Sequence, residues 1–354
     1  MKQEIIDKIN RLANQDEPFL FVINYQGDKA FIRQLSDINP EECLFDFEGR
    51  GNSSDEMKNN SEKIAEISWQ IAPPLYEDYE RSFDIVKNNI MAGNSYLTNL
   101  TCKVPVSCNL SLEDIFHRAK GKYKLLLRRK RNLTPFVCFS PETFVRIKNG
   151  RIYSYPMKGT LDASLPNAEK LLMEDRKEAA EHATIVDLIR NDLSRVAENV
   201  RVDKYRYVDV LHTNKGDILQ TSSEISGRLP EDYRQHLGEI LDAQLPAGSI
   251  TGAPKDKTMQ IIQEAEGYDR GFYTGIMGIY DQGELNSAVM IRFIEEETSP
   301  VDFEADGEKN FKANEGKKPK ESRELYFKAG GGITSKSDCR REYEEVIQKI
   351  YLPF

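Results

Sequence analysis

Histidine and paired cysteines are scarce in this sequence. Its 354 residues include four histidines and five cysteines, at positions 43, 102, 108, 138 and 339, and no CxxC pair occurs. The histidines lack ligand-like spacing, so a catalytic zinc or non-haem iron site is not expected. The cysteines form no even framework, which is typical of reduced thiols in a cytoplasm. A metal, if one is used, should therefore be held by oxygen ligands.

Long apolar runs and an excess of basic charge are also missing. No stretch approaches the roughly 18 apolar residues of a membrane span, and the amino-terminal MKQEIIDKINRLAN carries acids and no apolar signal core. We expect a cytoplasmic protein. A net charge of -9 argues against general nucleic-acid binding. One basic run, residues 120–131 (KGKYKLLLRRKR), favours a solvated helix face.

The rest of the composition is that of a soluble globular protein, with 39% hydrophobic and 30% charged residues. In a short amino-terminal part, residues 1–75, strands are expected at 19–23 and 30–34, and residues 49–61 indicate a mobile loop. A helix is expected at 79–91, with one apolar face. Near the carboxyl end, the charged residues 300–322 indicate a surface insertion.

Turn and cap signals predict the remaining elements. Residues 143–148, an Asn-Gly turn and residues 151–157 predict a hairpin, and residues 275–294 predict another around DQGE. A long helical stretch is expected at 169–197. A helix at 337–350 should open with a Ser or Asp cap.

Two glutamate pairs give the first chemical signal. Glu178 and Glu181 are three residues apart, and so are Glu342 and Glu345. Positions i and i+3 of a helix share a face, so each pair directs two carboxylates the same way. Two such helices facing each other would form an oxygen-only site suited to Mg²⁺. Taken alone, the same spacing is typical of a solvated helix surface.

Two tracts of small residues could bind anions. The glycine run at 328–334 (KAGGGIT) could turn backbone N–H groups towards an anion, or form only a tight turn or bulge. The tract 245–255 (LPAGSITGAPK) resembles an anion-binding loop at a helix N-terminus, or is only a loop. It lacks the GxxxxGK[ST] order of a Walker motif.

Four further side chains could carry binding or catalysis. Arg292, grouped with Tyr273, is expected on a strand among apolar residues, where it needs an anionic partner, either a structural glutamate or a substrate carboxylate. Lys158 ends an apolar strand and would have a lowered pKa in an apolar pocket, although most such lysines reach solvent. Glu142, 16 residues earlier, could lie on the adjacent strand and form an acid–nucleophile pair with Lys158.

Taken in order, these segments resemble the chorismate-binding enzymes, which include component I of anthranilate synthase, component I of aminodeoxychorismate synthase, isochorismate synthase and salicylate synthase. The resemblance covers residues 80–351. Its motifs are SPETF, PMKGT, KEAAEHATIVDLIRNDLSRVA, LPAGSITGAPK, RGFYTGIMG, IRF, KAGGGIT and REYEEVIQK. It implies one α+β catalytic domain over residues 1–354, with two stacked antiparallel sheets flanked by helices.

The resemblance also implies roles for these residues. Mg²⁺ would bridge the glutamate pairs and the ring carboxylate of chorismate, with Glu181 and Glu345 as direct ligands and Glu178 and Glu342 acting through water. Glu142 would be the acid that helps the 4-hydroxyl leave. The positions that match chorismate contacts are Gly159, Thr160, Ser249, Tyr273, Arg292, Gly330, Gly331, Gly332 and Lys349.

Two positions narrow the resemblance within the family. Leu97 stands where isochorismate and salicylate synthases have a lysine that activates water. Lys158 matches the lysine that marks aminodeoxychorismate synthases, whereas anthranilate synthases resemble PIAGT there. A lysine that adds to ring carbon 2 before ammonia enters at carbon 4 implies 4-amino-4-deoxychorismate, a precursor of p-aminobenzoate and folate. The alternatives are anthranilate synthase component I and a catalytically silent homologue that binds chorismate or a partner.

Some family features are absent. Gln220 stands where many relatives have a histidine, and it cannot carry a proton. No LLES-like segment is present, which counts against a tryptophan feedback site. Neither a glutamine amidotransferase signature nor the pyridoxal-phosphate lyase is present, so the resemblance implies a heterodimer with a separate ammonia-supplying subunit, or ammonia from solution.

Overall fold

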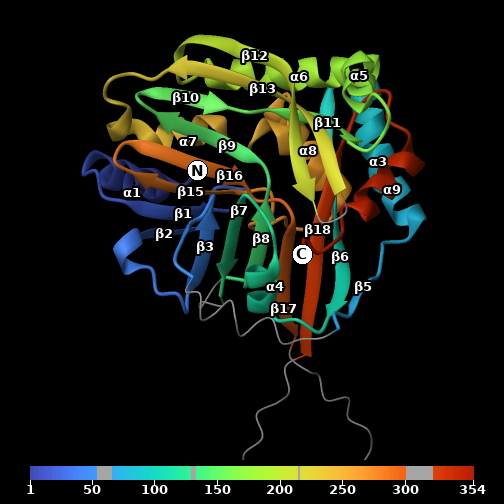
Figure 1. The fold of residues 1–354 in the computed structure, drawn as a ribbon, viewed down its shortest axis with the longest axis horizontal. Helices are drawn as coiled ribbons and strands as arrows, with labels where there is room; N and C mark the ends of the chain where they lie inside the picture. The colour runs from blue at the N-terminus through green and yellow to red at the C-terminus, as the bar shows by residue number, and fades with distance from the viewer. Residues whose placement is uncertain (54–65, 129–132, 214–215, 300–321) are drawn as a thin grey trace, which may run out of the picture.

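The computed structural model describes residues 1–53, 66–128, 133–213, 216–299 and 322–354. In this part of the chain, two antiparallel sheets of nine strands stack on each other, and helices cover their outer faces (Figure 1). The expected fold class, two stacked antiparallel sheets flanked by helices, is confirmed.

The first sheet crosses the top of Figure 1 in the order β11–β13–β10–β9–β16–β15–β1–β2, and β12 pairs with the outer side of β13. Its strands are β1 (Phe19–Ile23), β2 (Ala30–Gln34), β9 (Thr143–Lys148), β10 (Arg151–Ser154), β11 (Met157–Asp162), β12 (Glu198–Thr213), β13 (Gly216–Arg228), β15 (Ile276–Asp281) and β16 (Glu284–Val289).

The second sheet follows the order β14–β6–β18–β17–β8–β7–β3–β4, and β5 pairs with β6. Its strands are β3 (Cys43–Phe47), β4 (Arg50–Gly51), β5 (Trp69–Ile71), β6 (Leu97–Cys108), β7 (Tyr123–Leu127), β8 (Phe136–Ser140), β14 (Gly252–Ala253), β17 (Phe293–Ser299) and β18 (Ser322–Ile333).

Helices pack on the outer face of each sheet. The first sheet packs against α1 (Gln3–Asn14), α6 (Arg176–Leu193) and α7 (Leu237–Gln244). The second packs against α3 (Tyr76–Met91), α4 (Leu112–Arg118), α8 (Lys255–Glu266) and α9 (Cys339–Gln348). The other helical segments of the described residues are α5 (Ala168–Glu174) and the short 3₁₀ turns η1 (Leu35–Asp37), η2 (Tyr233–His236) and η3 (Gly248–Ile250).

Strand β1 shows how the core is divided. Phe19, Phe21 and Ile23 face the helices, whereas Leu20 and Val22 face the second sheet. Successive side chains of a strand point to opposite faces, so a strand buried on both faces carries a continuous apolar run. The sequence FLFVI is therefore apolar throughout, and every one of its residues is buried.

Several local expectations are confirmed. The strands predicted at 19–23 and 30–34 are β1 and β2. The helix predicted at 79–91 is α3, which begins at Tyr76 and buries its predicted apolar face. Helix α9 has an Asp cap, since the Asp338 side chain accepts a hydrogen bond from the Arg341 N–H. Residues 54–61 of the predicted loop and 300–321 of the predicted insertion lie outside the described residues.

Two element predictions around residues 151–197 are wrong in part. The stretch 169–197 is two helices, because Asp175 interrupts it and caps the second through the N–H groups of Lys177 and Glu178. The strand predicted at 151–157 ends at Ser154, and β11 then pairs with β13 instead of β9. Pro156 lies at the break and has no N–H to donate.

The basic run at 120–131 is not a helix face. Residues 123–127 form the buried strand β7 of the second sheet, because its leucines fill the core between flanking charges. Residues 129–131 lie outside the described part of the chain.

The second predicted hairpin also differs from expectation. Strands β15 and β16 pair as predicted, but β16 ends at Val289 and β17 begins at Phe293 in the other sheet. Arg292 lies in the crossing between them, with a left-handed φ of 55°. The chain thus passes from one sheet to the other at a residue predicted to lie within a strand.

The five cysteines, all in the described part of the chain, carry free thiols, as expected. Among the helices of the described residues, none has the length and apolar character required to cross a membrane.

Candidate active site

Lys158, on β11, lies among carboxylates. Its Nζ is 3.0 Å from Glu181 Oε2 on α6, and Lys177 Nζ is 3.7 Å from the other oxygen of the same carboxylate. Burial lowers the pKa of Lys158, but the charges of Glu181, Glu178 and Glu345 outweigh it, so the pKa lies above its ordinary value. The predicted decrease is therefore wrong, because these carboxylates stabilise the ammonium form.

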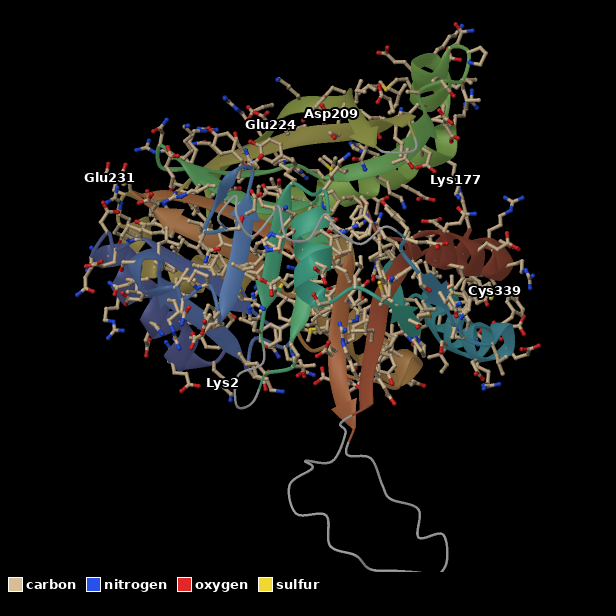
Figure 2. The ribbon with its side chains drawn as sticks, turned by 60° about the horizontal axis from the view of Figure 1, so that its bottom comes forward. Lys2, Lys177, Asp209, Glu224, Glu231 and Cys339 are labelled. Carbon is tan, nitrogen blue, oxygen red and sulfur yellow. The ribbon has the colours of Figure 1, made fainter. Side chains whose placement is uncertain are left out.

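The second glutamate pair lies on α9 and faces the same lysine. Lys349 Nζ is 2.8 Å from Glu345 Oε1 and donates a hydrogen bond to the Gly330 carbonyl at 3.0 Å. Burial raises the pKa of Glu342, and the nearby charge of Glu345 adds to this. Figure 2 shows the starts of the two helices, labelled at Lys177 and Cys339, on the same side of the molecule.

These carboxylates supply the oxygen donors that Mg²⁺ prefers. Burial raises the pKa of Glu178, and the charge of Glu181 adds to this, so a cation would relieve the crowding of like charges. Within the described residues, no group of three or more His, Cys, Asp or Glu side chains is close enough to hold a metal. Instead, lysine ammonium groups contact Glu181 and Glu345. The chemistry of these donors therefore suits Mg²⁺, but in this arrangement the carboxylates of the described residues are not gathered into a metal site.

The glycine run is neither a tight turn nor a bulge, so that one of the two sequence-based alternatives is wrong. Gly330, Gly331 and Gly332 continue β18 and pair in regular register with β6. A Cβ on Gly331 would lie 3.6 Å from Glu342 Oε2 and 3.8 Å from Lys349 Nζ. The missing side chain therefore leaves space in front of the second glutamate pair.

Gly159 likewise leaves space beside the first glutamate pair because it has no side chain. It has a φ of 86°, and a Cβ there would lie 2.9 Å from Glu178 Oε2. Its neighbour Thr160 is exposed, and their strand is held by Thr221, whose hydroxyl donates to the Lys158 carbonyl. Two glycines thus border the space between the carboxylate pairs, one in each sheet.

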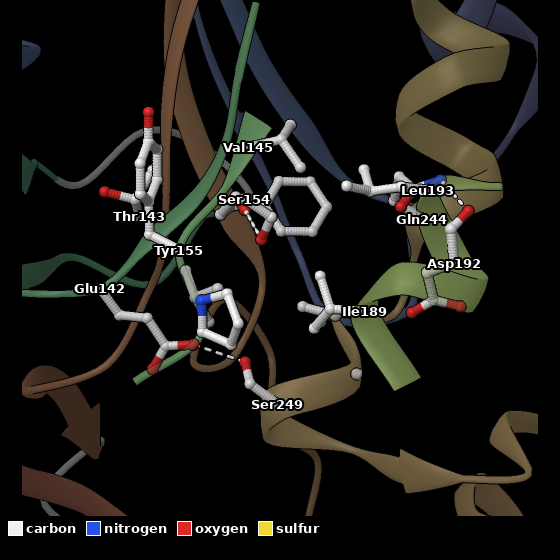
Figure 3. A pocket seen from close by; sticks show the side chains of 15 residues that line it. Glu142, Thr143, Val145, Ser154, Tyr155, Ile189, Asp192, Leu193, Gln244 and Ser249 are labelled. Carbon is white, nitrogen blue, oxygen red and sulfur yellow. Dashed lines mark hydrogen bonds between the residues drawn. The ribbon is translucent and has the colours of Figure 1, made fainter. Parts of the chain in front are cut away.

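The tract 245–255 forms η3, the short strand β14 and the start of α8. Within this tract, Ser249 Oγ donates a hydrogen bond to Glu142 Oε1 (Figure 3). Burial raises the pKa of Glu142, even though this hydrogen bond and the charges of Arg292 and Lys349 act in the opposite direction. The raised pKa shifts Glu142 towards its protonated form.

Behind Glu142 lies a cavity of about 20 Å³, which is room for a single water molecule. Ile189 lies between Glu142 and the opposite wall, which Asp192 and Gln244 form (Figure 3).

Glu142 and Lys158 do not lie on adjacent strands, so that expectation is wrong. Glu142 immediately precedes β9, and strands β10 and β13 separate β9 from the β11 strand of Lys158. The chain leaves the hairpin at Pro156 and β11 pairs elsewhere, which the sequence alone did not indicate. The carboxyl of Glu142 contacts Ser249, and the amine of Lys158 contacts Glu181.

Arg292 and Tyr273 flank this part of the site. The Arg292 guanidinium is partly exposed and lies 5.4 Å from the centroid of the Tyr351 ring. Its charge acts on Glu142 and on Tyr273, whose pKa is raised mainly by burial. Arg292 thus lies in the crossing between the sheets rather than within a strand.

One buried histidine beside the site was not predicted from the sequence. His182 follows Glu181 directly, is fully buried, and its Nε2 lies 2.7 Å from Ser223 Oγ on β13. Burial lowers its pKa. It fixes α6 to the sheet beside the first glutamate pair, and its position next to Glu181 was the signal available. Gln220 lies opposite Thr160 in the pairing of β11 with β13.

Comparisons with known proteins agree with this geometry. Residues 13–308 match the model of the chorismate binding enzyme family. An uncharacterized PabA-like protein of Haemophilus influenzae is 45% identical over 351 residues, covering 99% of this chain and 97% of that protein. Aminodeoxychorismate synthase component 1 of Salmonella typhimurium is 30% identical over 293 residues, covering 77% of this chain and 56% of that protein.

A solved structure is similar in fold. Anthranilate synthase component I of Streptococcus pneumoniae superposes with a TM-score of 0.61 at 25% identity, covering 80% of this chain and 58% of that one. The family match, the relative along almost the whole chain and the two-sheet architecture agree. The chain belongs to the chorismate-binding enzyme family.

Proposed function

We propose that this chain is an aminodeoxychorismate synthase component I, which converts chorismate and ammonia to 4-amino-4-deoxychorismate for p-aminobenzoate and folate synthesis in the cytoplasm. The observation that carries the proposal is Lys158, whose amine lies in the space bordered by the two glutamate pairs. The similarity to the Salmonella synthase supports it.

In the proposed reaction, Lys158 is the nucleophile and Glu142 is the acid. The neutral amine of Lys158, its ammonium proton released to water, forms a bond from Nζ to ring carbon 2. The two conjugated ring double bonds shift, the bond from carbon 4 to oxygen breaks, and Glu142 gives its proton to the departing hydroxyl, which leaves as water. Ammonia then bonds to carbon 4, the two double bonds shift back, and the lysine leaves carbon 2 as an amine. The proton shed by the new amino group restores the acid form of Glu142. The net change is chorismate and ammonia to the amino product and water.

Binding is assigned to the groups around this space. Arg292 and Tyr273 suit the enolpyruvyl carboxylate, while Gly159, Thr160 and Gly330 to Gly332 would allow the ring to approach the backbone. Magnesium, held by Glu181 and Glu345 with Glu178 and Glu342 in support, would neutralise the ring carboxylate. Lys349, now paired with Glu345, would lie beside that carboxylate.

Ammonia is proposed to come from a separate glutamine amidotransferase subunit, because the sequence contains no nucleophile-elbow cysteine with a matching His and Glu. Free ammonium at high concentration would replace it in the test tube. The first experiment therefore uses the isolated chain with chorismate, Mg²⁺ and ammonium, and separates the products by liquid chromatography with mass detection. We expect 4-amino-4-deoxychorismate, and anthranilate as the main product would overturn the assignment.

Anthranilate synthase remains the second candidate, because the solved anthranilate synthase component I shares the fold. The mechanisms differ in the covalent intermediate. Incubation with chorismate and Mg²⁺ but no ammonia should give an adduct on Lys158, seen by intact-protein mass spectrometry and lost in Lys158→Ala. Lys177→Ala is the matched control, since this lysine also lies near Glu181 but is 56% exposed. An active enzyme without an adduct on Lys158 would remove the covalent mechanism.

A further inference from the structure

A buried ion pair lies behind the candidate site. The guanidinium of Arg270 binds both carboxylate oxygens of Glu266, at 2.8 and 2.6 Å, and the two side chains are only 2% and 1% exposed. Such a pair stabilises a fold little compared with apolar residues of the same volume, because both charges lose their hydration. Fold stability alone therefore does not explain why the pair is buried here.

Arg270 also donates to the Thr274 hydroxyl at 3.4 Å and to backbone carbonyls on two other segments. Nη1 donates to the Ile250 carbonyl at 2.9 Å, and Nη2 donates to the Asn99 carbonyl at 2.7 Å. Glu266 also accepts from the Thr101 N–H and hydroxyl, each at 2.8 Å. The pair therefore joins η3, strand β6 and the end of α8 at one point.

The residues of this cluster are connected to candidate site residues by sequence adjacency, by a backbone hydrogen bond and by strand pairing. Ile250 follows Ser249, which donates to Glu142. The Arg270 carbonyl accepts from the Tyr273 N–H at 3.1 Å. Thr101 is the strand partner of Gly330. The ion pair is thus linked to the acid, to the buried tyrosine and to the glycine strand.

We propose that Arg270 is a positioning residue that fixes η3 through the Ile250 carbonyl and so holds the Ser249 hydroxyl against Glu142. This inference rests on the proposed role of Glu142 as the acid of the same site. Arginine suits the task because its planar fork can bind a carboxylate and two carbonyls at once, which a lysine cannot do.

The consequence is a change in the pH dependence of the reaction. Glu142 acts in its protonated form, so activity falls as the pH rises through its pKa. The groups that act on its charge are Ser249 from η3, Arg292 from the crossing between the sheets and Lys349 from the end of α9. The Ser249 hydrogen bond stabilises the carboxylate, so its loss should raise the pKa and move the alkaline limb to higher pH.

The test compares Arg270→Lys, Ser249→Ala and the double variant, following consumption of chorismate over a range of pH. We expect kcat of Arg270→Lys to fall roughly tenfold to a hundredfold, and its alkaline limb to move in the same direction as that of Ser249→Ala. The double variant should move the limb no further. A merely structural role would lower the active fraction and leave the limb in place.

A second variant covers the case in which Arg270→Lys does not fold. Replacing Arg270 and Glu266 together by Met leaves no unpaired charge but removes the same bond to Ile250, so it should show the same shift. A folded variant with an unmoved limb overturns the proposal, whether or not Ser249→Ala moves its own. Because chorismate consumption is followed, the result does not depend on which amino product forms.

Discussion

The two ends of the candidate site differ in how far their charged side chains are exposed to water. At the carboxylate end, formed by the two glutamate pairs and Lys158, side chains are partly open to water: Lys158 is 33% exposed and Glu345 is 54% exposed. At the acid end, formed by Glu142, Ser249 and the Arg270–Glu266 pair, the supporting ion pair is almost completely buried. In the proposed function, the open end would exchange ions and a charged substrate, and the buried end would hold the proton donor in place.

This difference in exposure suits the two requirements of the proposed reaction, which are binding with release and a fixed catalytic geometry. Charges near water interact weakly and rearrange at little cost, as binding and release require. Charges away from water interact strongly, and moving them is expensive, as a fixed catalytic geometry requires. The comparison is tested most directly by removing one charge at a time from each end.

The largest effect is expected from Glu142→Gln. The amide keeps the shape but cannot give a proton, so kcat should fall about 10²- to 10⁴-fold with little change in KM. The alkaline limb of the pH profile should vanish, because Glu142 loses activity as the pH rises through its raised pKa. Steady-state kinetics measures both quantities. Glu284→Gln, an exposed glutamate of the same sheet, is the control, and equal rates for the two variants would refute the role.

The next effect concerns stability. Arg270→Met leaves Glu266 buried without its partner, so the free energy of unfolding in urea should fall by about 3–5 kcal/mol. Lys158→Met removes a partly exposed ion pair and should cost about 1 kcal/mol or less. If both substitutions cost the same, the contrast between the two ends does not hold.

A smaller effect is expected for the outer carboxylates. Glu178→Gln and Glu342→Gln should each weaken the activating effect of Mg²⁺ by roughly 10- to 100-fold, as measured by titrating activity with the ion. Removal of Mg²⁺ with a chelator should abolish activity. Glu174→Gln, on the exposed face of α5, provides the control and should leave the titration unchanged.

The smallest effect is expected from Lys177→Met. This lysine contributes a mostly exposed pair to Glu181, so the change should correspond to about 0.5 kcal/mol or less, about a twofold change in KM. The difference should disappear at high salt, because exposed charges are screened. A large, salt-independent effect would mean that the carboxylate end is less open than its exposure indicates.

Local patterns predicted much of this fold. The apolar run of β1, the helix that buries Phe83 and the cap at Asp338 depend on neighbours in the sequence, and these predictions are confirmed. Pairings between strands that are distant in the sequence could not be predicted from neighbouring residues. Nothing in the residues around Gly330 distinguishes a turn from a strand that pairs with β6, and nothing around Arg292 marks the crossing between the sheets.

The same limit applies to the site. The spacing of the glutamates placed them on helices correctly, but the pKa of Lys158 depends on carboxylates from two distant helices. The partner of Glu142 proved to be Ser249, more than a hundred residues later in the chain, rather than Lys158. The Arg270–Glu266 pair gave no signal in the sequence, because only the tertiary structure brings η3 and β6 to it.

The interleaving of the two sheets along the chain bears on how this protein acquires activity. Strand β1 pairs with β15 from the last third of the chain, and the chain passes repeatedly between the sheets. Pairings so distant in sequence form slowly. Since Lys158 belongs to one sheet and Gly331 to the other, neither sheet alone contains the site. Recovery of activity during refolding should therefore require the stacking of the sheets and not only the formation of either one.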